Sequence, residues 1–137
     1  MDARASLSPV FAFQRGTSMI DFPGRLAAVL FTSGCNFSCG FCHNAAFMGR
    51  PRPGLTWEAL DQACRSLRRQ WAGGAVITGG EPTLADGQLD HLVAVLKGHG
   101  FAVKLDTNGG RPDVLRRLLP TLDYVAMDVK CSLERYP

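Results

Sequence analysis

Apolar, β-prone segments alternate with segments of helical period along the 137 residues of this chain. Apolar runs bounded by glycine, proline or polar residues predict four buried strands. These strands lie at residues 26–32, 75–78, 101–105 and 122–127. Apolar positions at helical spacing predict three helices, at residues 57–71, 89–96 and 112–119. Because such alternation produces a parallel sheet with right-handed crossovers, the sequence predicts an α/β fold.

Four chemically unusual segments follow, or end, the four predicted strands. They are the cysteine-containing run 35–42 and the segments 79–81, 106–108 and 128–130. In (β/α) barrels the residues that carry chemistry lie at the carboxyl-terminal ends of the strands. Packing alone does not account for cysteines and carboxylates at four such ends, so the sequence predicts a functional site there.

Cys35, Cys39 and Cys42 lie within eight residues, with no fourth cysteine nearby. Three thiolates could bind three irons of a [4Fe–4S] cluster and leave the fourth iron open, whereas an electron-transfer cluster normally has four cysteine ligands. A zinc site usually takes two separated pairs of ligands, although a Cys3His site that includes the adjacent His43 stays an alternative. Disulfides are disfavoured, because the chain has five cysteines and begins with no signal peptide.

Composition favours one soluble domain over the other classes of protein. The chain is 46% hydrophobic and carries a net charge of only +3, which gives no support to nucleic-acid binding. Its longest strictly apolar run, residues 26–31, is too short to cross a bilayer. We therefore expect a cytoplasmic protein without a membrane or nucleic-acid partner. Residues 1–9 are expected to form a flexible lead-in, and residues 10–137 a single domain.

The spacing C-x3-C-x-Phe-C, followed about forty residues later by Thr-Gly-Gly-Glu-Pro at residues 78–82, resembles the radical S-adenosylmethionine (radical SAM) enzymes. The resemblance implies that Cys35, Cys39 and Cys42 bind a [4Fe–4S] cluster whose open iron is chelated by S-adenosylmethionine. It also implies that Gly79, Gly80 and Glu81 contact the methionine part of that cofactor. The alternative without a functional role is that the two glycines form an ordinary turn at the end of a strand.

Five further segments are similar to the activating enzymes of glycyl radical enzymes, first those of anaerobic ribonucleoside-triphosphate reductase and next those of pyruvate formate-lyase. They are residues 18–24, 31–37, 42–44, 105–109 and 126–130. The resemblance implies a partial (β/α) barrel of about four βα units, truncated at its carboxyl-terminal side. It also implies anaerobic cleavage of S-adenosylmethionine to a 5′-deoxyadenosyl radical, which would generate a glycyl radical on a partner enzyme. The partners expected are anaerobic ribonucleotide reductase and a flavodoxin- or ferredoxin-type electron donor.

Residue roles follow from the same resemblance. The expected cofactor-binding residues are Phe41, His43, Gly79, Gly80, Glu81, Asp106, Asp128 and Lys130. A monovalent cation is expected at Asp106, Thr107 and Asp128, and the glycyl loop of the partner at Asp21. No acid–base residue is expected beyond the ligands of the cluster and the cofactor. The plain alternatives are a turn-forming Asp21 and a Lys130 that only neutralises Asp128.

Two other functions stay open from the sequence. Radical SAM enzymes that act on small molecules, such as 7-carboxy-7-deazaguanine synthase, share the cysteine and Gly-Gly-Glu-Pro motifs. A non-catalytic iron–sulfur or zinc binding fragment would also fit a truncated barrel. Outside the motifs, Cys64 lies on the apolar stripe of its helix and is expected in the core, while Cys131 follows a strand end and has no assigned role.

Overall fold

A five-stranded sheet forms the centre of the computed structural model, which describes residues 7–14, 16–37 and 51–136. The strands follow one another across the sheet in chain order. They are β1 (Val10–Phe13), β2 (Ala27–Thr32), β3 (Gly74–Gly79), β4 (Ala102–Thr107) and β5 (Tyr124–Met127). Strand β1 is antiparallel to β2, and strands β2 to β5 are parallel. The predicted α/β fold with a run of parallel strands is confirmed.

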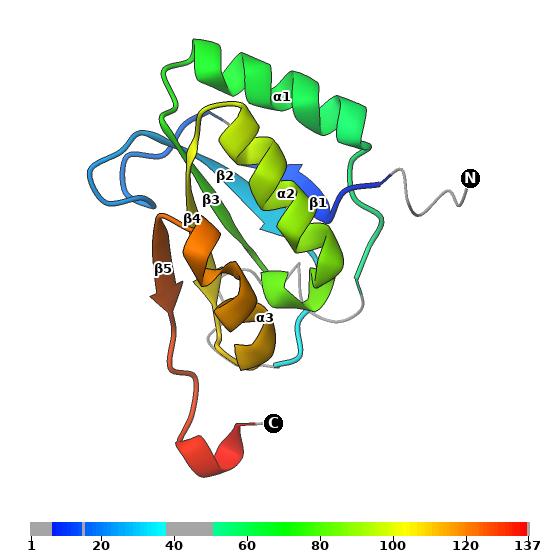
Figure 1. The fold of residues 1–137 in the computed structure, drawn as a ribbon, viewed down its shortest axis with the longest axis vertical. Coiled ribbons are helices and arrows are strands. Elements are labelled where there is room, and N and C mark those ends of the chain that lie inside the picture. The colour runs from blue at the N-terminus through cyan, green and yellow to red at the C-terminus, as the bar shows by residue number, and fades with distance from the viewer. Residues whose placement is uncertain (1–6, 15, 38–50, 137) are drawn as a thin grey trace.

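Three helices cover one face of this sheet (Figure 1). They are α1 (Trp57–Arg69), α2 (Gly87–Gly98) and α3 (Pro112–Leu118). Short 3-10 turns η3 (Pro82–Ala85), η4 (Leu119–Thr121) and η5 (Leu133–Arg135) complete the connections. The first helix begins where the sequence predicts, because the Thr56 hydroxyl accepts a hydrogen bond from the Ala59 amide at 3.1 Å and so satisfies one free N–H of the first turn.

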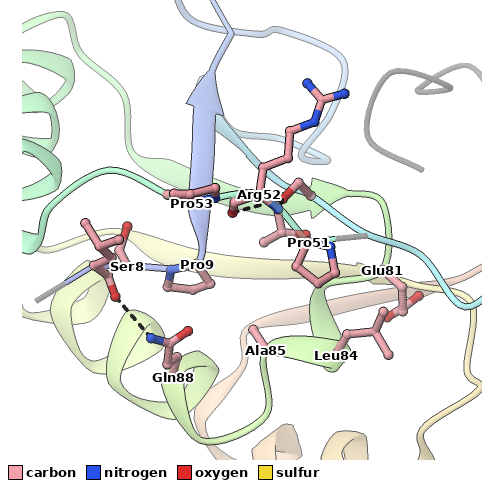
Figure 2. A pocket seen from close by; sticks show the side chains of 13 residues that line it. Ser8, Pro9, Pro51, Arg52, Pro53, Glu81, Leu84, Ala85 and Gln88 are labelled. Carbon is pink, nitrogen blue, oxygen red and sulfur yellow. Dashed lines mark hydrogen bonds between the residues drawn. The ribbon is translucent and has the colours of Figure 1, made fainter. Parts of the chain in front are cut away.

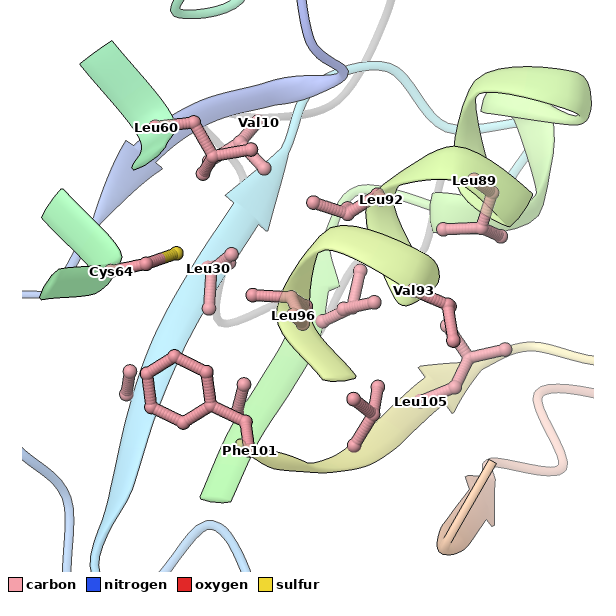
Figure 3. Packing of buried hydrophobic residues seen from close by; sticks show 14 of the residues in the cluster. Val10, Leu30, Leu60, Cys64, Leu89, Leu92, Val93, Leu96, Phe101 and Leu105 are labelled. Atoms are coloured by element: carbon pink, nitrogen blue, oxygen red, sulfur yellow. The ribbon is translucent and has the colours of Figure 1, made fainter. Parts of the chain in front are cut away.

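The main core lies between the helices and this face of the sheet, as Figure 3 shows. Alternate strand residues enter it, among them Leu30, Ile77 and Leu105, because successive strand side chains point to opposite faces. Leu60 and Cys64 reach it from α1. Burying one leucine side chain contributes about 1.5–3 kcal/mol, so this face supplies most of the hydrophobic stabilisation.

The other face of the sheet carries a smaller cluster with a different character. Phe22, Ala27 and Val76 pack together there, with Ala102 against them. Phe22 belongs to the connection between β1 and β2, which folds over the amino-terminal ends of the parallel strands (Figure 1). The polar side chains of β4 that share this face are described below.

Strand β1 is the main element that the sequence analysis missed. It has only four residues, and its ladder with β2 is irregular between Val10 and Ala12, so its sequence shows no period-2 pattern. Leu7 and Ser8, expected to belong to the lead-in, are paired as well. Leu7 bridges Thr56, and the Ser8 amide donates to the Leu55 carbonyl at 2.7 Å.

Within the described ranges, the longest helices are too short and too polar to cross a bilayer.

Candidate functional site at the carboxyl-terminal edge of the sheet

The four parallel strands end at one edge of the sheet, and the segments singled out in the sequence follow those ends. Residues 33–37 follow β2, residues 80–85 follow β3, residues 108–111 follow β4 and residues 128–136 follow β5. Figure 1 shows these segments at the end of the sheet toward which the parallel arrows point. The structure therefore gathers one part of each predicted motif at one place.

Gly79 is a point of very close backbone approach at this edge. Its φ is +122°, and a Cβ atom at this position would lie 2.1 Å from the carbonyl oxygen of Thr32. Hydrogen bonds hold the two chains together, from the Gly80 amide to the Thr32 carbonyl at 3.1 Å and from the Glu81 amide to the Gly34 carbonyl at 2.7 Å. Glycine is thus required here by strand-to-strand packing, and β3 is attached to the backbone that leads into Cys35.

Glu81 is a buried carboxylate that accepts hydrogen bonds from two strand ends. Only 2% of the residue is exposed. Its Oε1 atom accepts from the Thr83 amide at 3.2 Å and from the hydroxyls of Thr83 and Thr107, both at 2.7 Å. Its Oε2 atom accepts from the Asn108 amide at 2.7 Å. A buried charge needs such partners, and these join the end of β3 to the end of β4.

Asn108 extends this connection to the loop that carries the first cysteine. Its side-chain amide donates to Asn36 Oδ1 at 2.9 Å, while its own Oδ1 accepts from the Gly110 amide at 2.9 Å. Asn36 directly follows Cys35, whose sulfur accepts from the Phe37 amide at 3.4 Å. The Cys35 loop is therefore held by β4 through a chain of hydrogen bonds that begins at Glu81.

The carboxyl-terminal segment contacts the same loop. The rings of Phe37 and Tyr136 meet edge to face, with centroids 5.5 Å apart. The Tyr136 hydroxyl also accepts from the Lys130 amide at 2.9 Å. Sequence reasoning assigned no role to Asn36, Asn108 or Tyr136, although the two asparagines lie within segments 31–37 and 105–109 that it singled out.

Cys35 is half-buried at this edge. The other predicted ligands, Cys39 and Cys42, and the predicted cofactor residues Phe41 and His43 lie outside the described residues. Cys64 is fully buried in the core, as predicted. Burial, together with the charge of Asp61, raises the pKa of its thiol to about 11.

The three residues expected to bind a monovalent cation have three different partners. The Asp106 carboxylate pairs with Lys104 Nζ at 2.9 Å, and the Thr107 hydroxyl donates to Glu81. The side chain of Asp128 is 68% exposed and pairs with Lys130 Nζ at 3.3 Å. The backbone does bring the last two strands together here, because the Asp128 amide donates to the Thr107 carbonyl at 2.9 Å. The structure thus assembles the strand ends without directing these three side chains to one point.

Asp21 lies at the opposite, amino-terminal edge of the sheet, in the connection that precedes β2. The Ser18 hydroxyl donates to its carboxylate and accepts from its amide at 3.2 Å. These contacts are those of a turn stabilised by its own side chains. The structure therefore does not bring Asp21 to the edge that carries Cys35.

A pocket of about 540 Å³ adjoins Glu81 on the β1 side of the site (Figure 2). Its walls are residues 7–9, residues 51–54, the turn η3 and Gln88 at the start of α2. The Arg52 amide donates to Ser33 Oγ at 2.6 Å, which fastens this wall to the segment after β2. The volume lies within the range of small-molecule sites. Sequence reasoning assigned no role to Ser33, which lies within segment 31–37, or to Arg52, which lies in no motif.

Comparison with known proteins assigns the sequence motifs to a family. The family model for the Radical SAM superfamily matches residues 29–136. A protein of Methanocaldococcus jannaschii, whose name assigns it to the glycyl-radical enzyme activating enzymes, is 41% identical over 87% of this chain and 49% of its own length. The pyruvate formate-lyase-activating enzyme of Staphylococcus aureus is 33% identical over 66% of this chain and 38% of its own length.

Other similar proteins carry different names. The 7-carboxy-7-deazaguanine synthase of Thermococcus kodakarensis is 28% identical over 78% of this chain and 50% of its own length. The crystal structure of QueE from Escherichia coli matches with a TM-score of 0.47 and 22% identity, over 76% of this chain and 52% of the other. The chain spans about half the length of the first curated relatives it matches.

Proposed function

Because this chain belongs to the radical SAM superfamily, we propose that its protein binds a [4Fe–4S] cluster and S-adenosylmethionine at the carboxyl-terminal edge of the sheet. The observation that carries the proposal is the hydrogen-bonded path from buried Glu81 through Asn108 to Asn36, beside Cys35. A loop that binds a metal cluster through a few thiolates needs such support, since outer hydrogen bonds orient the ligands of a metal site.

The residues present fit such a group. Cysteine thiolates are the usual ligands of iron–sulfur clusters, and Cys35 lies half-buried where three strand ends meet. Cys35, Cys39 and Cys42 would bind the cluster, and the backbone at Gly79 and Gly80 would meet the methionine part of S-adenosylmethionine. When bound, these cofactors supply the one-electron chemistry that cleaves S-adenosylmethionine and allows hydrogen abstraction from carbon. The chain itself contributes binding, orientation and exclusion of water.

Glu81 acts in this proposal mainly as a support. Its carboxylate accepts four hydrogen bonds from Thr83, Thr107 and Asn108. The sequence alone favours a direct contact between Glu81 and the ammonium of the cofactor. The contacts in the structure favour instead a Glu81 that holds the ends of β3 and β4 in place, so that backbone groups beside it can meet the cofactor.

For the whole protein, we propose activation of a glycyl radical enzyme. The assigned name of the Methanocaldococcus jannaschii relative and the Staphylococcus aureus pyruvate formate-lyase-activating enzyme support this reaction. The partner proposed first is an anaerobic ribonucleotide reductase, with a flavodoxin- or ferredoxin-type protein as electron donor. Asp21 lies at the opposite edge of the sheet and is not included in this proposal.

A second candidate is the modification of a small molecule, and the Thermococcus kodakarensis 7-carboxy-7-deazaguanine synthase supports it. The pocket of about 540 Å³ beside Glu81 has a size suited to a small ligand. The two candidates share the cluster and S-adenosylmethionine, and they differ in what donates the hydrogen atom. The experiment must therefore vary that donor.

The test is reconstitution of the purified protein with iron and sulfide under anaerobic conditions. We expect close to four irons and four sulfides per chain, because three thiolates and one external ligand complete such a cluster. Purification with one tightly held zinc and no sulfide would instead support the metal-binding fragment. After a chemical reductant reduces the cluster in the presence of S-adenosylmethionine, we expect 5′-deoxyadenosine, together with a glycyl radical signal when the partner enzyme is present.

Matched variants separate the cluster from the fold. Cys35→Ala is expected to lose the cluster and all 5′-deoxyadenosine, whereas Cys64→Ala, in the core, is expected to keep both. Formation of 5′-deoxyadenosine that rises only with a deazaguanine precursor, and not with a glycyl radical enzyme, would favour the second candidate.

A further inference from the structure

Lys104 places a buried ammonium group on the face of the sheet that the helices leave free. It lies in the middle of β4, only 8% exposed, and is paired in register with Val76 of β3 and Tyr124 of β5. Lysine is rarely buried without a partner, because removing an ammonium from water is costly unless opposite charge and hydrogen-bond acceptors replace the water.

Three groups surround the ammonium. Its Nζ atom lies 2.9 Å from Asp106 Oδ1, donates to the carbonyl oxygen of Asp21 at 2.6 Å, and lies 5.8 Å from the centre of the Tyr124 ring. A carboxylate, a carbonyl and an aromatic face each favour a cation. These groups are those of a cation-binding site, and the cation that occupies it is the Lys104 ammonium.

Asp106 depends on this neighbour. Burial raises the pKa of its carboxyl, while the Lys104 ammonium and a hydrogen bond from Thr78 act in the opposite direction. Lys104 and Asp106 are two residues apart on one strand, so both side chains point to the same face. Successive side chains of a strand point to opposite faces, so the Thr107 side chain lies on the other face of the sheet from Asp106. There it donates to Glu81.

We propose that the Lys104 ammonium is the internal counter-cation of Asp106 and occupies the place where the family resemblance implies a bound monovalent ion. The other two residues expected at that ion support this assignment, because Thr107 is hydrogen-bonded to Glu81 and Asp128 pairs with Lys130. The proposal concerns the charge balance of the folded chain and does not depend on which radical reaction the protein performs.

The same ammonium also connects two distant parts of the chain. Through the Asp21 carbonyl it holds the connection between β1 and β2, and through Asp106 it holds the end of β4. A potassium or sodium ion bound to a Lys104→Met variant could restore the charge opposite Asp106. Lys104 is therefore a positioning residue, and its charge is the property to test.

The first experiment measures the melting temperature of the purified protein in potassium, sodium or choline chloride at equal ionic strength. For the wild type we expect the same melting temperature in all three salts, within about 1 °C. For Lys104→Met we expect a loss of about 5–10 °C in choline chloride, since an unpaired carboxylate is left behind. Potassium or sodium should recover part of that loss in a saturable way.

Two further variants test the charge itself. Lys104→Arg keeps the positive charge and should remain indifferent to the cation. In the double variant Lys104→Met/Asp106→Asn the carboxylate is absent, so the response to potassium or sodium should disappear. A response of Lys104→Met that persists without the Asp106 carboxylate, or no response with it, overturns the proposal. If Lys104→Met does not fold, the melting temperatures of the wild type and of Lys104→Arg still test the proposal. A saturable rise of either temperature with potassium or sodium would overturn it.

The last experiment repeats the comparison with the cofactors present. The dissociation constant of S-adenosylmethionine for the reconstituted wild-type protein should be equal in potassium and choline chloride. A saturable, tenfold or greater tightening by potassium or sodium would show an ion bound beside Lys104 and would overturn the proposal. Because binding and melting are measured, failure here is distinct from failure to form 5′-deoxyadenosine, which tests the proposed function.

Discussion

Glu81 and Lys104 hold loops at opposite edges of the same sheet, and they do so with opposite charges. At the carboxyl-terminal edge the Glu81 carboxylate accepts four hydrogen bonds from neutral amides and hydroxyls. Toward the amino-terminal edge the Lys104 ammonium donates to the Asp21 carbonyl and pairs with the charged Asp106. Glu81 thus satisfies a buried charge with several neutral donors, and Lys104 with one opposite charge and one neutral acceptor.

The difference teaches where each edge is rigid. Four hydrogen bonds from two strand ends fix the Glu81 carboxylate, and close backbone packing at Gly79 reinforces them. The loop before β2 is held by side chains, namely the Phe22 ring against Gly74 and the Lys104 ammonium. We therefore expect the carboxyl-terminal edge to tolerate less change than the amino-terminal edge.

The largest effect is expected at the two ends of β3. Gly79→Ala would place a Cβ atom 2.1 Å from the Thr32 carbonyl, at a φ of +122°, so we expect a loss of more than about 4 kcal/mol or failure to fold. Gly74→Ala is the matched variant, with its Cβ 2.8 Å from a Phe22 ring carbon. Because a side chain can move, its expected loss is about 1–3 kcal/mol. Urea denaturation measures both, and equal losses would contradict the contrast between the edges.

The next effect concerns the acceptor at the rigid edge. Glu81→Gln replaces one oxygen by an NH2 group, which cannot accept the hydrogen bonds made at that atom. These are the bonds from Thr83 and Thr107 at Oε1, or the bond from the Asn108 amide at Oε2. We expect a loss of about 2–4 kcal/mol in unfolding free energy, since buried donors are left unpaired. Glu58→Gln, on the exposed side of the first turn of α1, should change stability by less than about 0.5 kcal/mol. A Glu81→Gln protein as stable as Glu58→Gln would mean that these hydrogen bonds do not form.

Much of this scaffold could be predicted from the sequence, because its signals are local. The apolar runs give strands β2 to β5 within a few residues, and Thr56 marks the start of α1. The partners of Glu81 could not be predicted in this way, because Thr107 and Asn108 belong to another strand. The short strand β1 was missed because four residues in an irregular ladder leave no period-2 pattern.

In the candidate site, too, local sequence motifs predicted some residues, whereas contacts made in the folded sheet were not predicted. Cys35, Gly79 and Glu81 were identified from a motif, and the structure places them beside one another at the strand ends. The pairing of Asp106 with Lys104 was missed because the motif directs attention to Asp106 and its neighbour Thr107. Strand geometry sends that neighbour to the other face, and the residue two positions earlier becomes the partner.

A smaller effect is expected from the link between β4 and the cysteine loop. Asn36→Ala and Asn108→Ala each remove the 2.9 Å hydrogen bond between the two side chains. A double-mutant cycle should give a coupling energy of about 0.5–1.5 kcal/mol. Under the proposed function, we also expect each variant to retain less iron than the wild type after anaerobic gel filtration. Zero coupling, with full retention of iron, would show that the link does not support the loop.

The smallest change is a difference in reactivity between two cysteines of the apoprotein, and it compares the site with the core. Burial and the charge of Asp61 raise the pKa of Cys64 to about 11, so at pH 8 only about 0.1% of this thiol is ionised. Cys35 is half-buried in a loop and should be alkylated by iodoacetamide much faster. Peptide mass spectrometry after brief treatment measures both sites, and the same treatment in denaturant, where both should react, is the control.

Because the thiolate is the reactive form, raising the pH from 8 to 10 should speed alkylation of Cys64 by up to about a hundredfold if access is unchanged. Equal rates for the two cysteines in the native protein at pH 8 would contradict the placement of Cys64 in the core.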